Sequence, residues 1–263
     1  MDLNSQIKSY LNLLREGLGL KVKLIILLYI LFAPLRFIHK IFKCKFSRHY
    51  FGNVVIKNID GMFDCGKSYI SSRIVTTDSE KELRKFFNID RGVFIDVGAH
   101  IGKYTVTVAR KIRDSGKVIA IEPEPFNFSL LSQNVVLNHL NNVILHNVAC
   151  ADRDGKAILY VHEDCPTLHS FYINQGLKKI EVDTVTLDTL IKNLKIDRVD
   201  LIKIDVEAAE TDVFRGAVSV LQSYHPVIIF EAYDEIALNQ IKKIISNFNY
   251  KIKKIDGKNY YAY

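Results

Sequence analysis

Hydrophobic residues in the second half of the chain form short continuous runs, and longer amphipathic stretches separate them. A continuous run of four to six apolar residues is typical of a strand buried on both faces. Such runs occupy Val93–Val97, Val118–Ile121, Val143–Val148, Leu201–Ile204 and Val227–Phe230. The stretches that predict helices are Lys103–Ile112, Asn127–His139, Glu207–Leu221 and Asp234–Phe248. This alternation predicts an α/β domain with a parallel sheet.

Two further pairs of strands do not fit a parallel arrangement. Tyr250–Ile255 and Asn259–Tyr263 flank Asp256-Gly257, a dipeptide that favours a tight turn, so we expect a β-hairpin there. Lys156–Val161 and Lys179–Val185 predict a second hairpin, which frames the connection formed by residues 162–176. The sequence therefore predicts a mostly parallel sheet that ends in an antiparallel hairpin.

The region before the first long strand has a different pattern. Short apolar stretches such as Asn53–Lys57 alternate with turn residues up to Val75, which predicts small strands and hairpins. Residues 77–80 supply helix-capping side chains, and we expect a short helix from there to Phe87. We thus divide the chain into a basic apolar helical segment (1–50), a region of small elements (51–91) and a main domain (92–263).

The N-terminal segment combines an apolar run with basic flanks. Leu24–Leu35 contains no charge for twelve residues, with lysines before it and several basic residues after it. A bilayer-spanning helix needs about 20 apolar residues, so we favour a helix in the membrane interface, with peripheral contact through residues 18–48. A helix packed against the catalytic domain or a dimer partner, and a full membrane span, are the alternatives. The segment has no small-residue cleavage site, so we do not expect it to be a simple signal peptide.

Charge and cysteine usage narrow the cellular setting. The net charge of +7 lies within residues 1–52, which hold nine lysines and arginines against two acids. The main domain is charge-balanced and lacks the basic footprint of a nucleic-acid-binding protein, so we expect no such partner. The four cysteines form no Cys-x-x-Cys pair and indicate neither zinc nor disulfides. We expect a cytoplasmic protein, free or peripheral on the cytoplasmic face of the membrane.

The chemistry-bearing residues begin at the end of the first long strand. Asp96 leads into a turn from Gly98 to Gly102, and glycines allow backbone to approach a ligand closely. Glu122 ends the next strand, where a carboxylate accepts hydrogen bonds from ribose hydroxyls. We predict a nucleoside-cofactor site formed by these residues, with further contacts from His100 and, at the adenine, from Asn147.

These motifs resemble the FkbM family of methyltransferases. The resemblance covers residues 92–263 and rests on Ile95–Gly102, Ile121–Pro123, Thr186–Asp188 and Lys203–Glu210. It implies a class I, Rossmann-like sheet of seven strands with a C-terminal antiparallel hairpin, S-adenosylmethionine as cofactor and methylation of a hydroxyl. Two positions differ from the family, which usually has Asn at position 100 and Gly at position 208; we expect the start of the following helix to accommodate Ala208.

Methyl transfer requires a group that accepts the proton of the acceptor hydroxyl. Asp205 and Glu207 follow the strand Leu201–Ile204 and are the leading catalytic candidates, with Glu207 as base or orienting group. Asp205 holds the methionine end of the cofactor or structures the turn, and His169 is an alternative base. A divalent cation held by the two acids is an alternative, but the sequence offers no third ligand beside them, so we expect no metal site.

Two other functions fit parts of this pattern. A nicotinamide-dependent oxidoreductase also uses a glycine turn and a ribose-binding acid, but its Gly-x-Gly-x-x-Gly spacing is absent here. A non-catalytic, membrane-tethered nucleoside-binding protein would keep the sheet, and the departures at His100 and Ala208 motivate this alternative. The acceptor itself, whether a small molecule, a sugar, a glycan or a lipid-linked substrate, is not encoded in these motifs.

Overall fold

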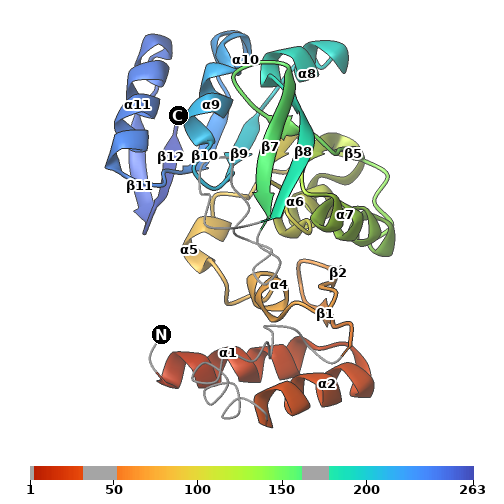
Figure 1. Ribbon diagram of the computed structural model, residues 1–263. Helices are drawn as coiled ribbons and strands as arrows, with labels where there is room; N and C mark the ends of the chain where they lie inside the picture. Colours follow the sequence, from red (N-terminus) through yellow and green to blue (C-terminus); the bar gives the residue numbers. More distant parts are fainter. Residues whose placement is uncertain (1–2, 32–51, 162–177) are drawn as a thin grey trace.

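A seven-stranded sheet forms the centre of the molecule (Figure 1). The computed structural model describes residues 3–31, 52–161 and 178–263. The strand order is β11-β12-β10-β9-β3-β4-β5, with β12 antiparallel to both neighbours and the strands from β10 to β5 parallel. The strands are β3 (Gly92–Val97), β4 (Gly116–Ile121), β5 (Val143–His146), β9 (Leu201–Ile204), β10 (Val227–Glu231), β11 (Ile252–Asp256) and β12 (Asn259–Ala262). The predicted parallel sheet with a C-terminal antiparallel hairpin is confirmed.

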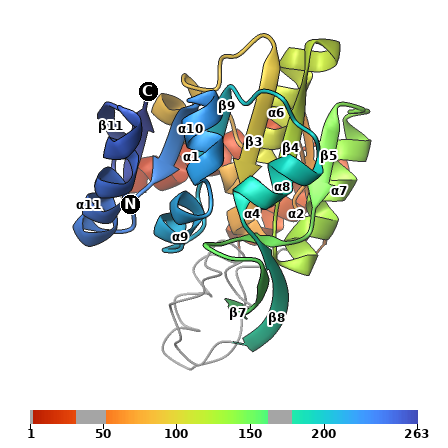
Figure 2. The same ribbon diagram turned by 90° about the horizontal axis from the view of Figure 1, so that it is seen from above.

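Helices cover both faces of this sheet (Figure 2). The two sides of β3 show the division: Ile95 packs into a cluster with α8 to α11, whereas Phe94 packs with α5 and α6 on the opposite face. The helices of the main domain are α6 (Lys103–Ile112), α7 (Pro125–Leu137), α8 (Leu187–Asn193), α9 (Glu210–Arg215), α10 (Val218–Tyr224) and α11 (Glu235–Ile245). Short 3-10 turns follow α6 (η1, Arg113–Ser115) and α11 (η2, Ser246–Phe248).

The helix that the sequence predicted over Glu207–Leu221 is two short helices. Glu207 and Ala208 have positive φ angles of 51° and 80°, so α9 starts only at Glu210. Gly216 then separates α9 from α10, and a Cβ at this position would lie 2.1 Å from the carbonyl oxygen of Ala151. This backbone contact leaves no room for a side chain, so glycine is required at the break between the two helices.

The N-terminal part forms a unit with its own core. Its elements are α1 (Leu3–Glu16), α2 (Gly19–Leu31), β1 (Val55–Lys57), β2 (Met62–Asp64), α4 (Tyr69–Ile74) and α5 (Lys81–Arg84). Strands β1 and β2 form the expected hairpin, but the strands predicted up to Val75 are wrong, because Ser68 caps α4 there. The helix predicted through Phe87 ends at Arg84. Ile101 and Leu130 of the main domain also belong to this core and join the two parts.

Helix α2 contains most of the described part of the apolar N-terminal run. Val22, Ile26 and Tyr29 are buried in the N-terminal core, which matches the packed-helix alternative on one face. The opposite face exposes four leucines, spaced as neighbours along one side of a helix: Leu20, Leu24, Leu27 and Leu31. Among the described residues, no helix is both long and apolar enough to cross a membrane. Residues 32–51 lie outside the described part.

The predicted hairpin between the third and fourth strands of the parallel sheet is confirmed. β7 (Gly155–Val161) pairs antiparallel with β8 (Lys178–Val185), and β6 (Ala149–Cys150) adds a parallel neighbour. Figure 2 shows this hairpin projecting from the body of the molecule. Its connection, including His169, lies outside the described residues.

Candidate functional site

A cavity of about 230 Å³ opens at the carboxyl ends of β3, β4 and β9. This is the sheet edge at which folds of this type bind their ligands. Its lining combines polar groups from these strand ends with apolar side chains that include Ile121, Cys150 and Leu159. The arrangement suits a ligand with an aromatic part and several polar groups.

The glycine turn forms the floor of this cavity. Gly98 has φ 78°, and a Cβ on it would lie 1.9 Å from the carbonyl oxygen of Asp205, so only glycine allows the ends of β3 and β9 to come this close. His100 also adopts a left-handed conformation, with φ 52°. This explains why His stands where the family usually has Asn, since both residue types tolerate that region better than most. Gly102 ends the turn and begins α6.

Glu122 directly follows β4, at the sheet edge where the cavity opens. Its carboxylate accepts hydrogen bonds from the backbone N–H groups of His100 (2.8 Å) and Glu124 (3.0 Å), and its side chain lines the cavity. Burial raises the pKa of Glu122 to about 7, although these two hydrogen bonds oppose the shift. A ligand hydroxyl that donates to this carboxylate therefore meets a desolvated acceptor.

A buried lysine connects the central strands. Lys203 Nζ lies 3.6 Å from Asp96 and 3.2 Å from Asp205, and it donates to the carbonyl oxygen of Gly98 at 3.2 Å. Burial alone would lower the pKa of Lys203, but the two carboxylates outweigh it and raise the pKa. Asp96 also accepts a 2.6 Å hydrogen bond from Thr105. Asp96 is thus directed at Lys203 and α6, and it does not line the cavity itself.

Three carboxyl groups near Asp205 have raised pKa values. Burial and the charge of Asp205 raise the pKa of Glu207 to about 8, with further contributions from Glu231 and Glu210. The same two causes raise the pKa values of Glu231 and Glu210 to about 7. Glu207 and Glu231 line the cavity beside Asp205, so two of its carboxyl groups gain or lose protons near neutral pH.

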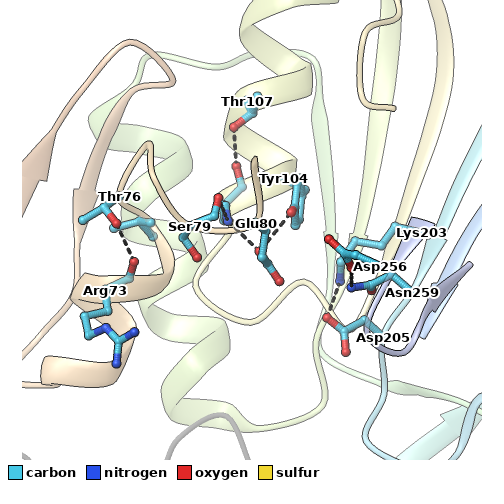
Figure 3. A network of polar contacts seen from close by, with 12 residues as sticks. Arg73, Thr76, Ser79, Glu80, Tyr104, Thr107, Lys203, Asp205, Asp256 and Asn259 are labelled. Atoms are coloured by element: carbon cyan, nitrogen blue, oxygen red, sulfur yellow. Dashed lines mark hydrogen bonds and ion pairs between the residues drawn. The ribbon is translucent and has the colours of Figure 1, made fainter. Parts of the chain in front are cut away.

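A second polar cluster in the cavity was missed from the sequence (Figure 3). Glu80 accepts hydrogen bonds from Lys103 Nζ at 2.6 Å and from the Tyr104 hydroxyl at 2.9 Å, and all three residues line the cavity. Burial and the charge of Glu80 raise the pKa of Tyr104, while burial lowers that of Lys103 against the opposing effect of Glu80. Lys103 and Tyr104 directly follow the glycine turn in the sequence, and this adjacency is the feature from which their place in the cavity could have been predicted.

The remaining predicted site residues lie around the cavity. Gly98, His100, Glu122, Asp205 and Glu207 line it together. The side-chain amide of Asn147 donates to the carbonyl oxygens of Glu122 (2.8 Å) and Pro123 (3.1 Å), outside the lining. Asn147 thereby holds the turn that follows β4. In the described part of the chain, no cluster of three or more His, Cys, Asp or Glu side chains is arranged to hold a metal ion.

The strand order and the position of the cavity define a class I, Rossmann-like methyltransferase fold. A model of the FkbM methyltransferase domain matches residues 96–252, which is more than half of the chain. The chain therefore belongs to the FkbM methyltransferase family.

Individual relatives match over shorter stretches. Methyltransferase 1 of Beauveria bassiana is 29% identical over 147 residues, covering 48% of this chain and 59% of that protein. Methyltransferase sdnD of Sordaria araneosa is 26% identical over 153 residues, covering 46% and 59%. The chain thus spans about three fifths of the length of these relatives. A crystal structure of an FkbM methyltransferase from Methylobacillus flagellatus aligns with a TM-score of 0.48 at 20% identity, covering 66% of this chain and 44% of that one.

Proposed function

We propose that the protein transfers the methyl group of S-adenosylmethionine to a hydroxyl of its acceptor. The observation that carries this proposal is the charge of the cavity. Among its described lining residues are the carboxyl groups of Glu80, Glu122, Asp205, Glu207 and Glu231, and a bound cation would favour the ionised form of each. Only two lysines, Lys103 and Lys203, stand against them.

This charge distribution favours S-adenosylmethionine over a nicotinamide dinucleotide as the cofactor. S-adenosylmethionine carries a sulfonium and an ammonium against one carboxylate, and a cation is stabilised by surrounding carboxylates. The pyrophosphate of a nicotinamide dinucleotide would be repelled by the same groups. Glu122 suits the ribose hydroxyls, and the apolar side chains of the lining suit the adenine. The residues present therefore fit S-adenosylmethionine, which when bound supplies an electrophilic methyl group.

The chain's own residues would position the acceptor and take its proton. Glu207 lies at the end of β9 on the cavity wall, and its raised pKa makes the ionised form a stronger base than an ordinary carboxylate. Asp205 and Glu231 maintain that basicity through their charge. We assign proton acceptance from the acceptor hydroxyl to Glu207, and the orientation of the cofactor's amino-acid end to Asp205 and Lys203. We propose a hydroxyl acceptor on a sugar, a glycan or a lipid-linked substrate.

Calorimetric titration with S-adenosylmethionine, S-adenosylhomocysteine and NAD tests the cofactor. We expect binding of the first two, and we expect Glu122→Gln to weaken both. Tight NAD binding without the other two would refute the proposal. Uptake of labelled methyl groups into glycan and lipid fractions then identifies the acceptor, and a comparison of these fractions by mass from cells with and without the protein gives independent evidence.

We propose further that the exposed leucine face of α2 rests on the cytoplasmic surface of an anionic membrane. Leu20, Leu24 and Leu27 lie on this face with 85%, 53% and 42% of their surface exposed, and Lys21 and Lys23 are exposed on the same helix. Leucines beside lysines complement acyl chains beside anionic headgroups. The buried free thiols of Cys65 and Cys150 are in keeping with a reducing compartment.

Flotation with vesicles that contain anionic lipid tests this contact. We expect the intact chain to float, and Leu24→Glu to reduce flotation strongly. Ile236→Glu, a change at an exposed apolar residue of α11, is the matched control and should float like the unchanged chain. Equal flotation of all three would exclude this face as the membrane contact, and concentration-dependent dimerisation abolished by Leu24→Glu would assign it to a second copy.

A further inference from the structure

Glu80 enters the cavity from outside the span that the family model covers. It lies at the N-terminal end of α5 with φ 51° and ψ 45°, a left-handed conformation that residues with a side chain rarely adopt. At this position a side chain commonly caps the helix, but Glu80 makes no capping hydrogen bond. Its carboxylate accepts hydrogen bonds from Lys103 and Tyr104 instead, and Figure 3 shows it turned toward Tyr104.

The two donors to Glu80 leave part of its carboxylate available. Both meet the Oε2 atom, and an ionised carboxylate has about four acceptor positions over its two oxygens. The side chain of Lys103 is only 8% exposed, whereas that of Glu80 is 38% exposed and lines the cavity. Glu80 thus presents a fixed hydrogen-bond acceptor to a ligand, and the buried ammonium of Lys103 balances the charge of Glu80.

The backbone before Glu80 is fastened to helix α1. The buried carboxylate of Glu16 accepts hydrogen bonds from the Thr77 hydroxyl (2.6 Å) and the Thr77 backbone N–H (3.3 Å). Asn12, one turn earlier on α1, is hydrogen-bonded to Asp78. Two successive residues of the segment leading to Glu80 are therefore held by α1.

We infer that Glu80 binds the α-ammonium group of the cofactor's amino-acid end, and that helix α1 positions it through Glu16. The inference rests on the proposed function. With its ribose on Glu122, the cofactor would place its amino-acid end in the part of the cavity that Gly98 and Lys203 line. There the ring of Tyr104 lies 5.7 Å from Lys203 Nζ, so Glu80 and Lys203 border the same part of the cavity. An ammonium there gains a charge-assisted hydrogen bond to Glu80.

Two ligands that differ only at this end provide the test. S-adenosylhomocysteine has the amino-acid end, whereas 5′-methylthioadenosine keeps the nucleoside and thioether without it. In calorimetric titrations we expect Glu80→Gln to weaken S-adenosylhomocysteine about 10- to 100-fold, the range for a charged hydrogen bond, and to leave methylthioadenosine within about 2-fold. Glu82→Gln is the matched control, because Glu82 is an exposed acid paired with Lys85 on the same helix. It should change neither affinity.

The outcomes separate this inference from the proposed function. If Glu80→Gln leaves both affinities unchanged, or weakens both equally, Glu80 does not bind the ammonium. If the unchanged chain binds neither ligand, the proposed cofactor itself is wrong. Retained methylthioadenosine binding shows that the variant is folded and the nucleoside part of the site intact.

The contribution of helix α1 is tested in the same titrations. Glu16→Gln and Thr77→Val weaken the attachment of the segment, so we expect each to reduce S-adenosylhomocysteine affinity by about 3- to 10-fold, the value of a single hydrogen bond, with less effect on methylthioadenosine. Gln6→Ala, a change at an exposed residue of α1, serves as control and should leave both affinities unchanged. Unchanged affinity in both variants would show that α1 does not position Glu80.

Discussion

Glu207 carries the chemical consequence of the acidic cavity at the scale of a single residue. With its pKa raised to about 8, most of the group is protonated at pH 7, and the ionised base accumulates as the pH rises. We therefore predict that methyl transfer increases with pH up to a plateau above about 8, measured as initial rates with the acceptor fraction that takes up label.

Substitution of Glu207 tests this assignment directly. Glu207→Gln should lower the turnover number roughly 100-fold or more and remove the rise, since a general base contributes about that much. Glu235→Gln, at an exposed position of α11, should keep both the rate and the profile. A Glu207→Gln enzyme with an unaltered pH profile would reassign the base.

Ala208 shows a conflict between its residue type and its backbone. Its φ of 80° is a glycine-like value, and the expectation that the following helix would simply accommodate alanine overlooked this strain. We predict that Ala208→Gly raises the free energy of unfolding by about 1 kcal/mol, measured by denaturant titration. Ala209→Gly, where φ is −103° and the methyl group is buried, should lower it. A loss of stability in both variants would contradict the strain.

At the scale of the elements, the pairing of β3 with β9 places opposite charges side by side. Asp96 and Lys203 are direct partners in the register of these strands, with 1% and 4% of their surfaces exposed. Lys203→Met leaves Asp96 buried without its counterion, so we predict a loss of roughly 3–5 kcal/mol of unfolding free energy. Combining it with Asp96→Asn should recover part of that loss. Lys254→Met on β11, an exposed change, should be nearly neutral.

The sequence was sufficient to predict those elements whose conformation depends mainly on neighbouring residues. The buried strands, the hairpin at Asp256-Gly257 and the glycine turn were predicted because their residue types favour these conformations directly. The break at Gly216 was not, because it depends on Ala151, which is distant in the sequence. Helix α4 was likewise hidden among turn residues until Ser68 was seen to cap it.

The residues of the candidate site also fall into those that the sequence could predict and those that it could not. Glu122, Asp205 and Glu207 were predictable because each follows a strand, and the ends of parallel strands meet at one edge of the sheet. Glu80 was not, since its place in the cavity depends on the packing of the N-terminal unit against α6. From the sequence alone, its only visible role was that of an acid near the start of a helix.

For the whole molecule, the clustered acids set how stability changes with pH. The pKa values of Glu122 and Glu210 rise from 4.5 to about 7 in the folded state, and that of Glu207 to about 8. The folded chain thus retains protons that the unfolded chain releases. The contribution of these three groups to the free energy of unfolding is therefore greatest below pH 4.5. This stability is lost as the pH rises through 7 to 8.

We predict that the midpoint of denaturant unfolding decreases between pH 6 and pH 8.5 in the absence of cofactor. The decrease should correspond to roughly 2–4 kcal/mol, and Glu207→Gln should make it smaller. S-adenosylmethionine, as a cation bound among the ionised acids, should offset it. A midpoint that rises over this interval would contradict the raised pKa values.

The position of β12 affects how the chain folds during its synthesis. A ribosome produces β10, then α11 and β11, before β12, yet β12 is the strand that lies between β10 and β11. Until residues 259–262 have left the exit tunnel, the nascent domain carries an open edge along the buried strand β10. Such an edge readily pairs with other chains, so the newborn protein is exposed to wrong strand pairing until β12 is in place.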